Sequence, residues 1–464
     1  MIKPVSRPAA LALVVTAALC AWTGATATSA TSDAQRRPTF AADIAPIVLS
    51  RCASCHRPGQ AAPFPLLSYD DVRAKGPEIA EMTGARLMPP WHATQGPGFP
   101  ALIDDRRLSD RQVEVIRTWV KSGMPSGDLR KAPALPILPA PWPLGVPELT
   151  IALPHVVGVP AGGSVELHNV VIPVGVPADV WVSAIDYLPT SAALRHARFF
   201  LAPPDLPVRN GDVLPGVGGL LGGGSLENYG DQVLAAGSTL VDLGGWTPGI
   251  ARRFLPEGLA IRIPARSSLV MQLHMRSGET DAVEDGRLAI YFAKPDARRA
   301  IVPVDVPPAL GIASGLLIPA GEAKHVLTDS FVLPIDVEAV GARGHAHYLG
   351  REMTMTATLP KGATRGLLKL TRWDVDWPDL YLFAAPVHLP KGTTIAAEIV
   401  YDNSAANLRN LFSPPRAVGW GRLGVGEMGS MGLLITAPSA GDTAVLDEAR
   451  AAHLRAQLMK GRRR

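Results

Sequence analysis

The amino-acid sequence predicts a multidomain protein in which an all-α unit is followed by two all-β subdomains of the jelly-roll or β-sandwich type. The chain has 464 residues, more than one hydrophobic core usually supports. Its 45 glycines and 44 prolines favour short strands joined by turns over long helices. Short apolar or alternating runs recur over residues 148–437, whereas helical patterns lie before residue 125 and after residue 438.

The N-terminus has the three parts of a secretory signal. Basic residues precede an apolar run over 9–22, which is short for a membrane span, and Ala25-Thr26-Ala27 offers a small-x-small cleavage site. We therefore expect residues 1–27 to be a signal peptide that is removed on export, together with Cys20. The mature protein is expected in the periplasm, without stable membrane insertion.

Charge gives no indication of a nucleic-acid partner. The formal net charge is only +4, and part of it lies in the basic tail over residues 460–464. No basic stripe with interleaved aromatic residues occurs elsewhere in the sequence. We therefore expect no nucleic acid among the partners.

One motif in the first third of the chain predicts a cofactor. Cys52-Ala53-Ser54-Cys55-His56 has the C-x-x-C-H spacing in which two thioethers tether a porphyrin and the histidine ligates its iron. The motif therefore predicts haem c bound by Cys52, Cys55 and His56. A diheme peroxidase is disfavoured because the sequence contains a single C-x-x-C-H.

Helical patterns flank this motif on both sides. A short helix is expected over residues 39–50, and Ser109 with Gln112 forms a capping-box pattern that opens a helix ending near Gly123. A helix before the motif and another at the end resemble the class I cytochrome c fold. The sequence thus predicts a cytochrome c domain over residues 38–128.

Met88 is the expected second axial ligand of the haem. It lies in Leu87-Met88-Pro89-Pro90-Trp91, where the prolines stiffen the loop that would hold its thioether toward the iron. The competing ligand is His92. Two further methionines are expected to be packing residues: Met82 and Met124. A haem with two protein ligands has no open position for a substrate, so it would pass electrons.

The rest of the chain divides at a proline-rich linker over residues 129–147, where prolines are too dense for a helix or an inner strand. Two β-rich subdomains are expected over 148–302 and 303–437. A C-terminal helix and basic tail are expected over 438–464.

His345-Ala346-His347 is the clearest metal-binding pattern in the β-rich part. It follows the strand-like run over residues 337–340, and residues i and i+2 of an extended chain point the same way. Both imidazoles can therefore converge on one ion. Imidazole suits Zn, Cu, Fe and Ni, and an added thioether shifts the preference toward copper.

The segment Gly344-His345-Ala346-His347-Tyr348-Leu349-Gly350 resembles the H-x-H segment of the copper type II, ascorbate-dependent monooxygenases. This is the family of peptidylglycine α-hydroxylating monooxygenase and dopamine β-monooxygenase. Three further segments resemble its bacterial relatives in the same order: Leu389-Pro390-Lys391-Gly392-Thr393, Tyr401-Asp402-Asn403-Ser404 and Gly426-Glu427-Met428. The resemblance covers roughly residues 148–437 and implies two jelly-roll subdomains, each with one copper, facing across a cleft.

By this resemblance the catalytic copper is held by His345, His347 and Met428, with Met431 as the alternative thioether. The electron-transfer copper of the family requires a His-His pair and a third histidine. Here the matching segment is Leu194-Arg195-His196-Ala197, so an arginine, which cannot ligate, stands at the first position. A second copper at His196 and His274 is left open. Three residues could complete it: His168, His325 or Met275.

These features together predict a copper-dependent monooxygenase that hydroxylates a C–H bond of a small-molecule substrate with O2. The reaction consumes two electrons beyond those of the substrate C–H bond, and the fused haem would deliver electrons to the copper from an external donor. The alternative is a non-oxygenase periplasmic protein that transfers electrons or binds copper on the same scaffold.

Overall fold

The computed structural model describes residues 37–58, 62–94, 96–135, 142–163, 165–202, 204, 213–215, 241–248, 254–294, 299–312, 314–421 and 425–461. The predicted signal peptide over residues 1–27 lies outside these residues. Among the helices described, none is both long and apolar enough to cross a membrane.

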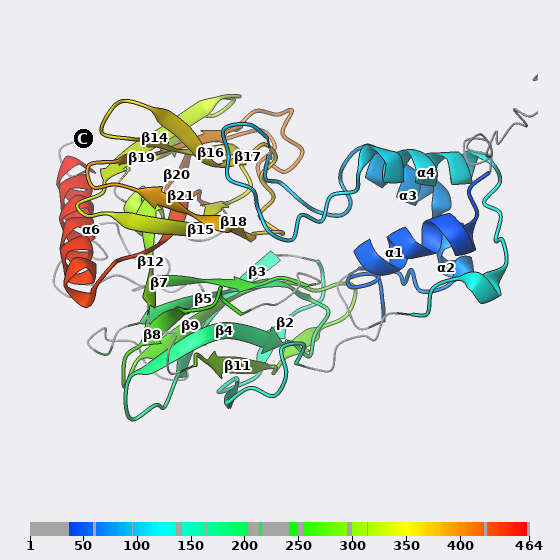
Figure 1. Ribbon diagram of the computed structural model, residues 1–464, viewed down its shortest axis with the longest axis horizontal. Helices are drawn as coiled ribbons and strands as arrows, with labels where there is room; N and C mark the ends of the chain where they lie inside the picture. The colour runs from blue at the N-terminus through cyan, green and yellow to red at the C-terminus, as the bar shows by residue number, and fades with distance from the viewer. Residues whose placement is uncertain are drawn as a thin grey trace, which may run out of the picture.

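The first described residues form short helices on one side of the molecule, seen in blue and cyan in Figure 1. They are the π-helix η1 (Phe40–Ile44), α1 (Ala45–Arg51), α2 (Tyr69–Ala74), α3 (Gly76–Gly84) and α4 (Asp110–Lys121). The capping box of α4 is confirmed, because the Gln112 N–H donates to Ser109 Oγ at 3.2 Å and the Ser109 N–H donates to Gln112 Oε1 at 2.9 Å. Trp119 and Ile116 of α4 pack with Ile44 in a small core.

The prediction of an all-α class I cytochrome c domain is wrong. The protein is mostly β-sheet, distributed over several sheets, and its described residues contain no domain of that fold. The physical reason lies between α3 and α4. Ala93 and Leu102 of this connection form bridges with Leu370 and Phe383, and they are buried in the core of the C-terminal β region. The helices therefore share their connecting segment with a β-sheet core.

Backbone hydrogen bonds fasten this connection to the β region along its length. The Thr94 N–H donates to the Lys369 carbonyl at 2.8 Å, and the Ile103 N–H donates to the Leu382 carbonyl at 3.0 Å. Arg106 Nη2 adds an ion pair with Asp379 at 2.6 Å. Figure 1 shows the connection as the long loop that reaches from the helices toward β17 and β18.

An eight-stranded sheet runs through the β region in the order β1 (Leu149–Ala152), β11 (Arg287–Phe292), β4 (Val180–Leu188), β8 (Leu259–Ile263), β12 (Arg299–Val306), β21 (Gly429–Thr436), β15 (Val337–Ala346), β18 (Leu380–Leu389). The sequence predicted two β-sandwich subdomains over 148–302 and 303–437, and in the structure β12 joins these two halves of the β region. β12 pairs in parallel with β8 at Arg299 and Ala300, and antiparallel with β21 over Ile301–Val306.

Two further sheets cover the two ends of this long sheet. One has the order β6 (Val213–Pro215), β3 (Val165–Pro173), β9 (Ser268–Arg276), β5 (Leu194–Ala202), β7 (Val241–Trp246). The other has the order β14 (His325–Val332), β19 (Thr394–Tyr401), β16 (Gly350–Thr358), β17 (Thr364–Leu370). Two short pairs join β10 (Ala282–Glu284) to β2 (Val157–Val159) and β13 (Leu317–Ile318) to β20 (Val418–Gly419).

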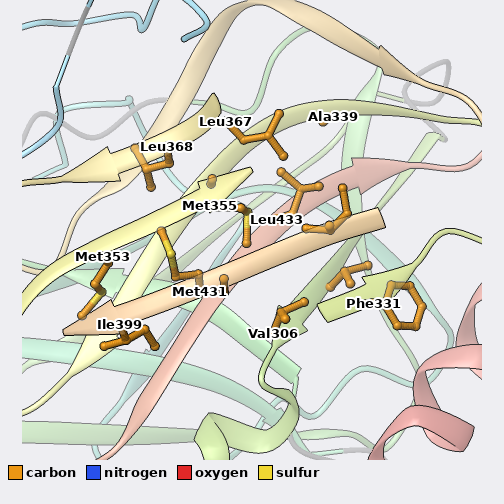
Figure 2. Close-up of a cluster of buried hydrophobic side chains, with 14 of the residues drawn as sticks. Val306, Phe331, Ala339, Met353, Met355, Leu367, Leu368, Ile399, Met431 and Leu433 are labelled. Carbon is orange, nitrogen blue, oxygen red and sulfur yellow. The ribbon is translucent and has the colours of Figure 1, made fainter. Parts of the chain in front are cut away.

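The larger core lies between the four-stranded sheet and the β12–β21–β15–β18 end of the long sheet. Figure 2 shows Met353 and Met355 of β16 meeting Met431 and Leu433 of β21 within it. The C-terminal helix α6 (Ala440–Gly461) covers one side of this core, where Leu446 is fully buried. His453 Nε2 of α6 lies 2.9 Å from Asp329 Oδ2 of β14.

Candidate metal centre

The H-x-H residues lie where β15 ends. β15 runs between β18 and β21, so neighbouring strands flank it on both sides, and His345 and His347 are both buried. The register pairs His345 with Ser430 and ends at Ala346 opposite Gly429. The pairing brings the residues just before β21 beside the H-x-H turn, so two chain segments that are distant in sequence meet here.

Met428 meets His345 at this place. The distance between His345 Nε2 and Met428 Sδ is 3.3 Å, although the residues are 83 positions apart in the chain. The alternative thioether, Met431, lies in the hydrophobic core with Met353 and Met355, as Figure 2 shows. The structure thus brings the imidazole of His345 together with the sulfur of Met428, the pair that the resemblance implies.

The orientation of His347 is fixed by a backbone carbonyl. Its Nδ1 lies 2.9 Å from the Gly426 carbonyl oxygen, which can only accept, so Nδ1 carries the proton and Nε2 keeps its lone pair. The ring centroids of His345 and His347 are 5.6 Å apart. Burial lowers the pKa of His347 to about 4, and burial followed by the charge of Arg198 holds the pKa of His345 well below its usual range. Both imidazoles are therefore neutral near pH 7, the form that binds metal.

His196 and His274 form a second pair, on the neighbouring strands β5 and β9. They lie opposite each other in register, and their rings stack at 3.9 Å between centroids. His274 Nε2 lies 3.3 Å from Gln272 Oε1, whereas the buried His196 Nδ1 has no hydrogen-bond partner within the described part of the chain. Burial is the main cause that lowers both pKa values, and the positive charge of Arg198 lowers each of them further.

The residues that could complete a metal site at this second pair have other surroundings. His168 Nε2 lies 3.0 Å from Glu166 Oε2, Met275 packs in the core of the N-terminal β half, and His325 lies on β14 beside Tyr401. Among the residues that the structure describes, no group of three or more His, Cys, Asp or Glu side chains is placed to hold a metal ion. The thioether of Met428 is a further donor beside His345.

Arg195 is the extra residue of a β-bulge. The register of β5 against β9 shifts between Leu194 and His196, so Arg195 has no opposite residue, and it is only partly buried. Burial raises the pKa of Asp376, and the positive charge of Arg195 is one of several effects that lower it. Arg195 therefore lies near the acidic residues that follow β17.

Arg198 was missed from the sequence, although it is one of the buried cations of this region. It follows His196 by two positions on a regular part of β5, so the two side chains share one face, and it is 3% exposed. Its charge lowers the pKa of all four histidines: His196, His274, His345 and His347. The i, i+2 spacing from His196 is the signal that would have found it.

A cavity of about 130 Å³ lies between the two halves of the β region. Its lining includes Arg198 of β5 and Arg343 of β15, with further residues from β4, β7, β8 and β18. Arg343 precedes His345 by two positions and forms an ion pair with Asp305 at 3.1 Å. The cavity is thus next to the strand that carries the H-x-H motif.

The C-x-x-C-H motif forms a turn at the end of α1. Cys52 and Cys55 are free thiols, and the His56 N–H donates to the Cys52 carbonyl at 2.9 Å. His56 Nδ1 lies 3.1 Å from the Phe64 carbonyl oxygen, so Nδ1 is the donor and Nε2 keeps a lone pair for a metal. Burial raises the pKa of the Cys52 thiol to about 12, as expected of an apolar environment that suits a porphyrin. This donor set fits a covalently attached haem.

The two candidates for the second haem ligand have different neighbours: Met88 lies near the end of α3, and His92 contacts the β region. The Met88 N–H is 3.3 Å from the Met82 carbonyl, at the end of α3, and its side chain is partly exposed. The His92 carbonyl accepts the Thr371 N–H of the β region at 3.2 Å, and its buried Nε2 has no partner within the described residues. Met124 packs against the core of the helices, as expected.

Comparisons with known proteins add little to this picture. No protein-family model matches the chain, and no curated protein matches it in sequence. Among solved structures, a peptide-N(4)-(N-acetyl-β-D-glucosaminyl) asparagine amidase is similar at 12% identity and a TM-score of 0.30, over 61% of this chain and 97% of that one. A structure of infectious bursal disease virus is similar at 11% identity and a TM-score of 0.18, over 64% and 74%. Similarities this low carry no argument about function.

Proposed function

We propose that the protein is a copper-dependent monooxygenase that hydroxylates a C–H bond of a small molecule with O2. The observation that supports this most is the 3.3 Å contact between His345 Nε2 and Met428 Sδ, beside a His347 whose Nε2 keeps its lone pair. Two imidazoles and one thioether form a donor set that suits copper better than Mg, Ca or Mn. When bound, copper supplies one-electron redox chemistry and an open position for O2.

The side chains around the centre prepare it in three ways. Burial keeps His345 and His347 neutral, the Gly426 carbonyl holds His347 in the tautomer that presents Nε2, and the packed strands exclude water. We assign the substrate to the neighbouring cavity lined by Arg198 and Arg343. Hydroxylation of R–H by O2 needs two electrons and two protons, and it yields R–OH and water.

A haem held by Cys52, Cys55 and His56 would provide the electrons. Haem c attached to Cys52 and Cys55 and ligated by His56 would be refilled by an external donor. The connection between α3 and α4 supports this role, because it bridges directly to Leu370 and Phe383 of the strands beside the centre. A carrier on the same chain acts at a high effective concentration.

The test is aerobic turnover of the haem- and copper-loaded protein with isotope-labelled O2, a reductant and a panel of small molecules that includes carboxylates. We expect O2 consumption coupled to a product that holds one labelled oxygen atom. Copper-free protein is the control. Copper binding without coupled O2 consumption or labelled product from any compound would contradict the proposal.

The second candidate is a non-oxygenase that transfers electrons or binds copper. The buried Arg198 favours it, because its positive charge opposes cation binding near all four histidines. This reading predicts that reduced copper and haem are stable to O2 in the presence of every compound tested.

Met88 is expected to ligate the haem iron, because Pro89 and Pro90 stiffen the loop that carries its thioether. Met88→Ala should abolish the weak sulfur-to-iron absorption band of the oxidised protein, whereas the matched variant His92→Ala should retain it. Persistence of the band in Met88→Ala would show that another sulfur is the ligand.

Replacing Cys52 and Cys55 together by alanine should abolish covalent haem attachment.

A further inference from the structure

Glu427 lies between the two segments that form the candidate metal centre. It is fully buried, directly before Met428, and its carboxylate contacts both segments that carry the proposed ligands. Oε1 accepts the backbone N–H of His347 and, at 2.8 Å, that of Met428. Oε2 accepts the backbone N–H of Leu349 at 2.9 Å. One side chain thus joins the H-x-H turn to the methionine segment.

This link lies just beyond the point where the strand ladder ends. The antiparallel ladder of β15 and β21 ends at Ala346 opposite Gly429. His347 and Met428 each lie one residue beyond that end, where no ladder hydrogen bond fixes their separation. The Glu427 carboxylate ties these two residues together at that point, and the bond from His347 Nδ1 to the Gly426 carbonyl accompanies it.

Burying a carboxylate costs desolvation free energy, so it is an unusual group for a purely structural link. A buried charged group loses its hydration, and it is tolerated only where strong donors replace the water. Backbone N–H groups from two separate segments are such donors, and charge-assisted hydrogen bonds to them are stronger than neutral ones. The two oxygens of the Glu427 carboxylate accept N–H groups from both segments at once, whereas a glutamine amide offers one acceptor oxygen and an NH2 group that can only donate.

We propose that Glu427 is a positioning residue that sets the separation of His347 and Met428, and thereby the affinity and geometry of the copper site. The inference rests on the proposed copper centre. Groups that orient metal ligands from behind typically change metal affinity by about 10–100-fold when they are replaced. Glu427 acts through the backbone of the ligand residues.

Glu284 supplies a matched control within the same chain. It is also a fully buried carboxylate with hydrogen bonds from the Tyr187 hydroxyl at 2.7 Å, the Ser191 N–H at 3.0 Å and the Gly286 N–H at 2.9 Å. It lies on β10, in the half of the β region that lacks the H-x-H motif. Replacing either glutamate removes a comparable buried network, so a loss of stability alone would be common to both.

The experiment compares Glu427→Gln with Glu284→Gln in the haem-loaded full chain. Cu(I) affinity is measured by competition with a chromophoric chelator, and sulfur coordination by X-ray absorption at the copper edge. We expect Glu427→Gln to bind Cu(I) about 10–100-fold more weakly and to lose the sulfur signal. Glu284→Gln should match the wild type in both. Wild-type affinity and sulfur signal in folded Glu427→Gln would overturn the proposal.

Two additions keep the test decisive. If Glu427→Gln does not fold, Glu427→Asp keeps the charge but shortens the reach, and it should still weaken Cu(I) binding; wild-type affinity there would overturn the proposal. Amide hydrogen exchange of the copper-free protein measures the link without metal: the Leu349 amide should exchange faster in Glu427→Gln than in the wild type. If the wild type binds no copper, the proposed function fails, while unchanged exchange at Leu349 refutes the positioning role by itself.

Discussion

Replacing His345 or His347 by alanine is expected to remove nearly all copper from the mature, haem-loaded protein. Each variant leaves one imidazole and the Met428 thioether, and two ligands of which one is neutral sulfur hold copper poorly. The emptied position also lies in a buried region near the Arg198 charge, so no water-rich surface compensates for the lost ligand. The copper-to-haem ratio after desalting measures the effect.

His388→Ala is the matched control for these two variants. His388 also lies in the C-terminal β half, but its side chain is 62% exposed and its Nδ1 bonds Glu338 Oε1 at 2.9 Å. It should keep the wild-type copper content, and all three variants should keep the haem spectrum. Met428→Leu should weaken Cu(I) more than Cu(II), because the thioether is the soft ligand. Full copper in both His345→Ala and His347→Ala would refute the site.

The residues of the candidate metal centre could be found from the sequence only through motifs. The i, i+2 spacing of His345 and His347 follows from strand geometry, and the resemblance pointed to Met428. The contact itself depends on β15 pairing with β21 across 83 positions, which no local pattern encodes. The same long-range pairing explains why Glu427 was passed over, since a glutamate before a methionine has no local mark of burial.

The wrong fold class has a comparable cause. The local signals for the first helices were sound, because the capping box of Ser109 and Gln112 is present and α4 begins after it. The connection before that helix has no strong pattern of its own. It gains its structure from edges that lie far along the chain, where Ala93 bridges to Leu370 and Leu102 to Phe383. Reading the helices alone therefore suggested a self-contained domain.

β12 shows the same limit for the β region. Its residues were expected at the break between two sandwiches, at the boundary between 302 and 303. In the structure Pro303 instead lies opposite Leu434 in the ladder with β21, and the strand joins both halves into one sheet. A proline at a position where its missing N–H is not required is compatible with such a strand.

The mature protein is expected to carry one copper and one haem. The sequence attributed the loss of a second copper to Arg195, but that residue occupies a bulge of β5. Arg198 supplies the stronger argument, because it is buried on the same face as His196. The positive charge of a buried guanidinium two residues along the same strand face opposes a Cu(II) ion at His196. His196 and His274 alone would hardly offset this.

If the protein holds one copper, the haem would store the second electron. Electron transfer from the haem to the copper can then be tested. Stopped-flow mixing of reduced protein with O2 should show haem reoxidation in the wild type and a large slowing in His347→Ala, which lacks the copper. With substrate present the electrons balance, since one from the haem iron and one from copper, together with two protons, convert R–H and O2 to R–OH and water. His388→Ala should behave as the wild type.

Equal haem reoxidation in wild type and His347→Ala would mean that copper lies off the electron path. The non-oxygenase function, electron transfer or copper binding, would then be the better supported one. Two tightly bound coppers in the wild type would show that Arg198 does not exclude the second ion.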